Sequence, residues 1–310
     1  MADLLSHLGA ARATMITPQF TMQQHENPTF AAVNNYIASL LPLKENDISR
    51  LYHVPNTPLY DPETTVVEQI VLSITPTPGV YSFIGHHPSD KSTCTSTKPC
   101  PPACSRLPRT ICFLHRPFNL ERHRVRDDTL IISSHTSFDE ALTVGWNPVL
   151  AGRLGLELSE ALCIQGYKRD LDRKIGIVSC VSMPMAQLIG GIREEFGDIE
   201  YVFEGPCEEI HVVAIINAFN AHEVHRILDT ARGRGWISLD DDGRNILYIT
   251  GQPRTAGVEA AKLLRMPVVC VGHHQAENWG IRYIAAQLRN RYSGLCVEEI
   301  YEEEVTILRQ

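Results

Sequence analysis

The sequence lacks the features of a membrane, secreted or nucleic-acid-coating protein. No apolar run is long enough to span a bilayer, and the N-terminus lacks the basic-then-apolar order of a secretory signal. Basic residues are the minority, with 28 Lys and Arg against 36 Asp and Glu, and the formal net charge of -8 disfavours nonspecific binding to phosphate backbones. We therefore expect a cytoplasmic protein, with mitochondrial and nuclear locations as alternatives, and neither a membrane nor a nucleic acid as its partner.

Motifs that would identify a cofactor are also missing. The chain has no Walker-type or dinucleotide-type glycine motif, and its nine cysteines form no C-x-x-C pair. Six cysteines lie in or beside apolar runs, as buried free thiols do in a reducing compartment. The other three, Cys94, Cys100 and Cys104, lie in a segment rich in Pro, Ser and Thr. We interpret residues 89–110 as a flexible insertion.

The rest of the chain has an ordinary globular composition, with 44% apolar and 21% charged residues. Runs of β-branched residues alternate with segments of helical spacing, which predicts an α/β fold. We expect a flexible leader over 1–26 and one domain over 27–310. The predicted strands are 79–84, 129–133, 174–180, 199–203, 210–216, 245–250, 268–271 and 295–300; the predicted helices are 28–41, 139–154, 183–196, 220–234, 255–265 and 277–292; residues 65–74 fit either.

Metal-ligand residues follow three of these predicted strands. In α/β folds, ligands bind outside the carboxyl ends of the strands, so the three clusters are expected to meet at one site. Histidine and carboxylate together are the ligands of zinc, manganese and iron sites. The clusters are His86 with His87, His135 with Asp139, and His273 with Glu277.

Each cluster taken alone also has a structural explanation. His135 would hydrogen-bond Asp139 or cap the following helix, and His274, next to a ligand-type histidine, fits a solvent-exposed position. The four-residue spacing of His273 and Glu277 places both on one side of a first helical turn. Gly272 before them permits a sharp turn from strand to helix.

Other histidines give weaker signals. His222 and His225 are three residues apart, one short of the H-E-x-x-H spacing of zinc proteases, which favours a surface helix face. His115 and His123 lie beside or within the Arg-rich stretch 116–126. That stretch could contact anionic substrate groups such as phosphates, although a solvated face is the favoured interpretation.

The ordered motifs resemble the Nif-three-like family, also catalogued as GTP cyclohydrolase 1 type 2 homologues. The resemblance covers about residues 80–300 and rests on HHP, HTSFDEAL, YITG and VGHHQAENWGI, in that order. It implies a Nif-three-like fold, with two related α/β halves of mixed sheets flanked by helices and the metal site between them. It also implies a toroidal homohexamer.

The resemblance further implies a dinuclear centre with two divalent ions per subunit, of zinc, manganese or iron. The function it favours is a metal-dependent hydrolase, cyclohydrolase-like or phosphoesterase-like, acting on a nucleotide or another phosphate-containing small molecule. The alternative is a metal-binding scaffold or regulatory interaction protein without turnover. The implied metal ligands are His86, His87, Asp139, His273 and Glu277, and the implied proton relay is His135.

Overall fold

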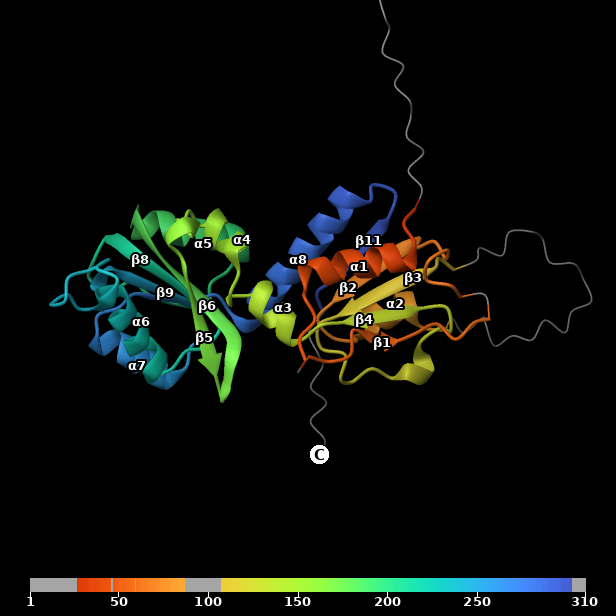
Figure 1. The fold of residues 1–310 in the computed structure, drawn as a ribbon, viewed down its shortest axis with the longest axis horizontal. Coiled ribbons are helices and arrows are strands. Elements are labelled where there is room, and N and C mark those ends of the chain that lie inside the picture. Colours follow the sequence, from red (N-terminus) through yellow and green to blue (C-terminus); the bar gives the residue numbers. More distant parts are fainter. Residues whose placement is uncertain (1–26, 46, 59, 87–106, 303–310) are drawn as a thin grey trace, which may run out of the picture.

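The protein folds into two lobes, each built on a mixed β-sheet (Figure 1). The structure is a computed structural model and describes residues 27–45, 47–58, 60–86 and 107–302. The expected leader, most of the expected insertion with its three cysteines, and His87 lie outside the described residues. Within the described part of the chain, no helix is long and apolar enough to cross a membrane.

The first lobe contains a five-stranded sheet with the strand order β1-β4-β3-β2-β11. Strands β4, β3, β2 and β11 pair in parallel, and β1 pairs antiparallel with β4. Strand β11 comes from the far end of the chain, so the N- and C-terminal parts of the described chain share this sheet (Figure 1). The strands are β1 Leu51–His53, β2 Gln69–Ser73, β3 Thr110–Leu114, β4 Leu130–Ser133 and β11 Cys296–Ile300.

Both faces of this sheet are covered by helices, which explains why its central strands are continuously apolar. Helix α1, Phe30–Leu40, and helix α8, His273–Arg291, lie over one face, where Ile70 and Leu72 join the largest hydrophobic core (Figure 1). Val71, which lies between Ile70 and Leu72 in the strand, packs in a separate core with helix α2, Pro78–Ile84. Alternate residues of a strand therefore serve opposite faces.

The second lobe contains a six-stranded sheet with the strand order β5-β6-β8-β9-β10-β7. Helix α5, Met185–Phe196, packs in the largest core on one face, and α6, Ala221–Gly233, and α7, Thr255–Leu263, pack in a second core on the other. The strands are β5 Leu162–Tyr167, β6 Asp170–Pro184, β7 Tyr201–Phe203, β8 Glu209–Ile216, β9 Ile246–Thr250 and β10 Val268–Cys270.

Helices α3, Thr136–Ala141, and α8 join the lobes, and they pack closely against each other (Figure 1). A Cβ atom added to Gly280 of α8 would come within 2.5 Å of Phe138 Cζ and 2.7 Å of Leu142 O. Only a residue without a side chain allows this approach. The close packing brings the beginning of α8 beside α3, and with it the ends of strands from both sheets.

The predicted α/β class is confirmed, and most predicted elements are present with shifted ends. Asn220 caps α6, because its side chain accepts a hydrogen bond from the Glu223 N–H. Helix α1 is capped by Thr29, whose side chain accepts a hydrogen bond from the Ala32 N–H. Residues 65–74 contain the strand β2.

Several boundary predictions are wrong. The strand predicted at 79–84 is the helix α2, which has Pro78 in its first turn, a position that proline favours. The helix predicted at 139–154 is two short helices, α3 and α4, and α4 begins at a proline, Pro148–Arg153. Helix α8 begins at His273, as the spacing of His273 and Glu277 predicted, although the periodicity alone indicated a helix only over 277–292. Strands β1, β3 and β5 were not predicted, and the described residues also contain 3-10 turns at Arg122–Arg124, Leu158–Glu160 and Gly243–Asn245.

Candidate metal centre

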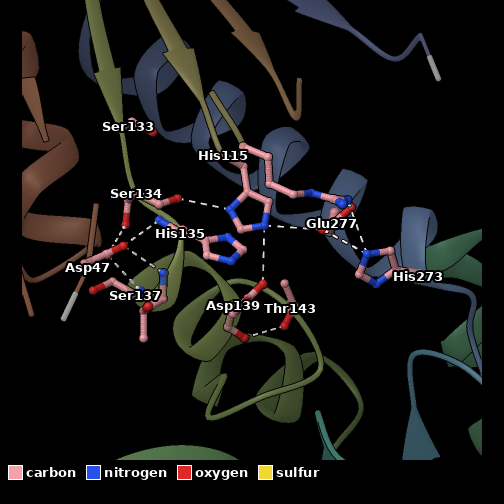
Figure 2. Close-up of polar contacts among 12 residues, drawn as sticks. Asp47, His115, Ser133, Ser134, His135, Ser137, Asp139, Thr143, His273 and Glu277 are labelled. Atoms are coloured by element: carbon pink, nitrogen blue, oxygen red, sulfur yellow. Dashed lines mark hydrogen bonds and ion pairs between the residues drawn. The ribbon is translucent and has the colours of Figure 1, made fainter. Parts of the chain in front are cut away.

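Ligand-type side chains from both lobes meet where three strands end (Figure 2). His115 directly follows β3, and His135 follows β4 by one residue. Asp139 lies in α3, the helix that begins after His135. His273 and Glu277 lie one turn apart at the start of α8, which follows β10 of the second sheet. The site therefore lies at the junction between the two sheets.

The imidazole of His115 is fully buried at the middle of this cluster. Its Nδ1 lies 3.0 Å from the carbonyl oxygen of Ser134, and because a carbonyl only accepts, Nδ1 is the donor. The ring also stacks on Phe138, with centroids 4.3 Å apart. These contacts fix the ring so that Nε2 lies 3.3 Å from Asp139 Oδ1 and 3.3 Å from Glu277 Oε1.

The two carboxylates decide the charge of His115 when no metal is bound. Burial of the ring opposes protonation, but the hydrogen bonds and charges of Asp139 and Glu277 outweigh it and raise the pKa of His115 to about 9. Burial raises the pKa of each carboxyl, yet contact with His115 brings the net pKa of both below the ordinary value. The centre thus combines two ionised carboxylates with one protonated ring at neutral pH.

His115, His135 and Asp139 form the imidazole side of the centre, and they fit a metal ion. Ligand atoms of all three residues lie within 4.8 Å of one another. His115 Nε2 and His135 Nδ1 are buried, and neither makes a well-directed hydrogen bond to any described residue. His115 Nε2 has only its two 3.3 Å contacts with carboxylates, and the buried His135 Nδ1 has no hydrogen bond to a described residue, which is costly unless something binds it. Two imidazoles with a carboxylate suit zinc, manganese or iron.

Arg116, His273 and Glu277 form the guanidinium side of the centre. Arg116 Nη2 donates a hydrogen bond to Glu277 Oε2 and lies 3.2 Å from His273 Nε2. His273 Nε2 also lies 3.3 Å from the other carboxylate oxygen, Glu277 Oε1. The Glu277 side chain is 2% exposed, whereas the Arg116 side chain is 28% exposed and the His273 side chain 42%. The guanidinium of Arg116, which stays protonated, therefore supplies the positive charge on this side of the centre.

The other two rings are held neutral at pH 7. Burial lowers the pKa of His135, and the neighbouring charge of His115 lowers it further. Burial also lowers the pKa of His273. The negative charge of Glu277 raises this pKa, and the positive charge of Arg116 lowers it. Neutral imidazole is the form that binds a metal ion or accepts a hydrogen bond.

Asp47, in the loop after α1, holds the beginning of α3 in place (Figure 2). Its carboxylate accepts hydrogen bonds from the backbone N–H groups of His135, Thr136 and Ser137, at 2.9, 2.9 and 3.1 Å. Burial alone would raise the pKa of Asp47, but these backbone donors bring it below the ordinary value. A carboxylate at a helix N-terminus satisfies donors that the helix itself leaves unpaired. Asp47 thereby fixes the backbone that carries His135 and Asp139.

The cluster contains four of the six residues that sequence reasoning selected: His135, Asp139, His273 and Glu277. Gly272 has φ 99°, which confirms the predicted sharp turn before α8. His86 is exposed after α2 and belongs to no metal-competent group among the described residues. The structure does not describe His87.

Sequence reasoning missed His115 as a ligand and Arg116 as its neighbour. The signal was present, because the apolar run Thr110–Leu114 is a strand and His-Arg-Pro follows it directly. The same pattern of an apolar run followed by His-His-Pro drew attention to residues 86–88 instead. There the apolar run is a helix and delivers its histidine to the surface.

Comparison with known proteins identifies a matching family. The model of a family described as Duf34/NIF3 (NGG1p interacting factor 3) matches residues 118–304, which is more than half of the chain and includes His135, Asp139, His273 and Glu277. None of the curated proteins matches the sequence.

Solved structures of low sequence identity share the fold. The reduced form of HcgD from Methanocaldococcus jannaschii has a TM-score of 0.55 at 14% identity, and the similarity covers 88% of this chain and 98% of that one. A Bacillus cereus protein related to NIF3 has a TM-score of 0.52 at 12% identity, covering 92% and 100%. The protein TTHA1606 from Thermus thermophilus has a TM-score of 0.51 at 14% identity, covering 90% and 100%.

Proposed function

Because the chain belongs to the Duf34/NIF3 family and carries a metal-competent cluster at the junction of its sheets, we propose that it is a metal-dependent hydrolase. Its substrate is a nucleotide or another phosphate-containing small molecule. The observation that carries this proposal is the pair of buried ring nitrogens, His115 Nε2 and His135 Nδ1, without well-directed hydrogen bonds among the described residues.

Three residues would hold the metal ion: His115, His135 and Asp139. A divalent ion with such ligands supplies Lewis acidity and lowers the pKa of a water molecule. The Ser134 carbonyl orients the His115 ring, which fixes the tautomer that offers Nε2. Glu277 contacts the same ring, so its buried carboxylate would hold His115 in place, and the proton that His115 gives up to a metal ion would pass to solvent.

The charge at the rim of the centre favours an anionic substrate. Arg173 of β6 lies with Nη2 3.5 Å from Asp139 Oδ2, and its side chain is 27% exposed. Arg116 approaches from the other side. Two guanidinium groups beside a metal-competent cluster suit a phosphate group, whose oxygens accept hydrogen bonds from planar donors. Both arginines would position the substrate and balance its charge.

The test is a hydrolysis screen on protein whose metal content has been measured. Wild type is assayed against phosphate esters and purine nucleotides, with Asp139→Asn as the matched variant that lacks an anionic ligand. We expect turnover by the wild type that a chelator abolishes and that Asp139→Asn loses. Equal rates in wild type and variant would attribute the activity to a contaminant. Bound metal without any turnover would favour the non-catalytic scaffold.

We also propose a homohexamer in a reducing compartment such as the cytoplasm. Family membership supports the assembly, and the six cysteines in the described residues, all of which are free, support the compartment. Light scattering coupled to size-exclusion chromatography tests the assembly, with six chains per particle as the expected result and a stable monomer as the contradicting one.

A further inference from the structure

Arg116 reaches the centre from the strand end next to His115. The backbone N–H of Arg116 donates to the Ile74 carbonyl at 2.7 Å, which fixes where the side chain begins. Its Nη2 then lies between the carboxylate of Glu277 and the Nε2 atom of His273. Both of these groups present lone pairs to the same nitrogen. The guanidinium therefore sits where a cation bound by this carboxylate and imidazole would sit.

The cluster contains enough ligand-type side chains for two metal ions. Histidine and carboxylate groups occur on both sides of His115, and the guanidinium side has a His–Glu pair one helical turn apart. The difference between the sides is the arginine. A guanidinium stays protonated at every pH at which proteins fold, so its charge cannot be removed to admit a second cation.

The close contacts on the two sides of the centre differ in the same way. On the imidazole side, His115 Nε2 and His135 Nδ1 are buried without a well-directed hydrogen bond to the described residues. On the guanidinium side, His273 Nε2 and Glu277 Oε2 both face Arg116 Nη2. Ligands that already face a cation gain little from binding another, and like charges in so small a space repel.

We infer that Arg116 supplies the second cation of this centre, so that each chain binds one divalent ion on the imidazole side and none between His273 and Glu277. This inference rests on the metal site of the proposed function and departs from the two ions that the family resemblance implies. The centre pairs one exchangeable ion with one fixed guanidinium. A phosphate bound to the metal would meet Arg116 as the neighbouring positive group.

The experiment is a count of Mn²⁺ ions per chain, by electron paramagnetic resonance of free Mn²⁺ during titration of chelator-treated protein. Mn²⁺ is the suitable probe because it prefers carboxylate and imidazole to the thiols of the nine cysteines. The proteins compared are the wild type, Arg116→His, Arg116→Lys and the matched control Arg254→His, which changes an exposed arginine before α7.

We expect one ion per chain in the wild type, in Arg116→Lys and in Arg254→His. Arg116→His is expected to bind two, because an imidazole replaces the fixed cation beside His273 and Glu277. Two ions close together also couple their spins, which broadens the spectrum of bound Mn²⁺. Circular dichroism checks that each variant is folded, and the wild-type count tests the inference even if one variant is not.

The outcomes separate this inference from the proposed function. Two ions in the wild type would overturn the inference and leave the metal site standing. No bound ion in the wild type would overturn the metal site itself. One ion in a folded Arg116→His protein would show that Arg116 is not what excludes the second ion, and would also overturn the inference.

Discussion

The imidazole side and the guanidinium side of the centre share one chemistry, a carboxylate beside a histidine, but they differ in the cation they face. On the guanidinium side, Glu277 and His273 meet the permanent charge of Arg116. On the imidazole side, Asp139 shares the pocket with two rings that each keep a buried nitrogen without a well-directed hydrogen bond to the described residues. On one side the chain supplies its own cation, and the other side fits a metal ion.

This difference teaches that ligand-type residues do not by themselves define a metal site. His273 and Glu277 have the residue types and the spacing of a ligand pair, yet an arginine from another strand end occupies the space before them. The feature that separates the two sides is whether the chain provides its own counter-charge. The predictions below test that distinction, beginning with the largest effect.

Removing the charge of Asp139 should greatly weaken metal binding on the imidazole side. Asp139→Asn keeps the shape of the side chain but removes the only anionic ligand of the three in the group. Loss of an anionic ligand should weaken Mn²⁺ binding on the order of 1,000-fold, more than the effect typical of groups behind the ligands. Calorimetric titration measures this, with Asp229→Asn, an exposed carboxylate on α6, as the matched control. An unchanged affinity in Asp139→Asn would remove this residue from the site.

In the metal-free protein, a proton on His115 should supply the missing positive charge of the imidazole side. The folded pKa of about 9 lies above the ordinary value of 6.5, so the resulting stabilisation is complete below pH 6.5 and is lost as the pH rises through 9. The shift corresponds to about 3 kcal/mol of unfolding free energy. Urea unfolding at pH 6, 7.5 and 9.5 in the presence of a chelator measures it.

His115→Gln is the control for this pH dependence, because glutamine does not titrate. Its unfolding free energy should change much less than that of the wild type between pH 6.5 and 9.5, because the titrating imidazole is gone. A wild-type curve as flat as that of the variant would show that the two carboxylates do not hold a proton on His115.

Asp47 should act on the imidazole side through the backbone of α3. Asp47→Ala leaves the N–H groups of His135, Thr136 and Ser137 without their acceptor, which should lower the unfolding free energy by about 2 kcal/mol. Because His135 then loses its fixed position, Mn²⁺ affinity should fall about tenfold. Thermal melting and titration measure the two effects.

Asp47→Asn keeps an oxygen acceptor. Its losses of unfolding free energy and of Mn²⁺ affinity should therefore be about half those of Asp47→Ala. If stability falls in Asp47→Ala while the metal affinity stays that of the wild type, Asp47 supports the fold alone and does not position the ligands.

Arg173 should have the smallest effect, because its contact with Asp139 is long and partly exposed. Nη2 lies 3.5 Å from Oδ2, and the side chain is 27% exposed. Arg173→Gln removes a positive charge that competes for the same carboxylate, so Mn²⁺ affinity should rise about two- to fivefold. A fall in affinity would mean that Arg173 holds Asp139 in place for the metal instead of opposing it.

The fold class was predictable because hydrophobic periodicity reflects burial directly. The runs that became β4, β8, β9 and β10 are apolar on both faces, as buried strands are. Short apolar runs are ambiguous, and Pro78–Ile84 became a helix because proline starts the turn and one side packs on the sheet. That packing is tertiary information which a local window does not contain.

The candidate site was predictable only in part, for a similar reason. Asp139, His273 and Glu277 stand out because their spacing places ligand-type residues on a helix start. His115 is a single histidine after a strand, and its role depends on two helices from other parts of the chain, which bring Asp139 and Glu277 to the same ring. The contact of Arg116 with Glu277 spans 161 residues, so spacing along the sequence carries no sign of it.

The most direct test of the central distinction is a crystal structure of the protein with Mn²⁺, with the ions located by anomalous scattering. The account predicts one anomalous peak per chain, bounded by His115, His135 and Asp139, with the Arg116 guanidinium still against Glu277. A peak between His273 and Glu277, or two peaks in one chain, would contradict it.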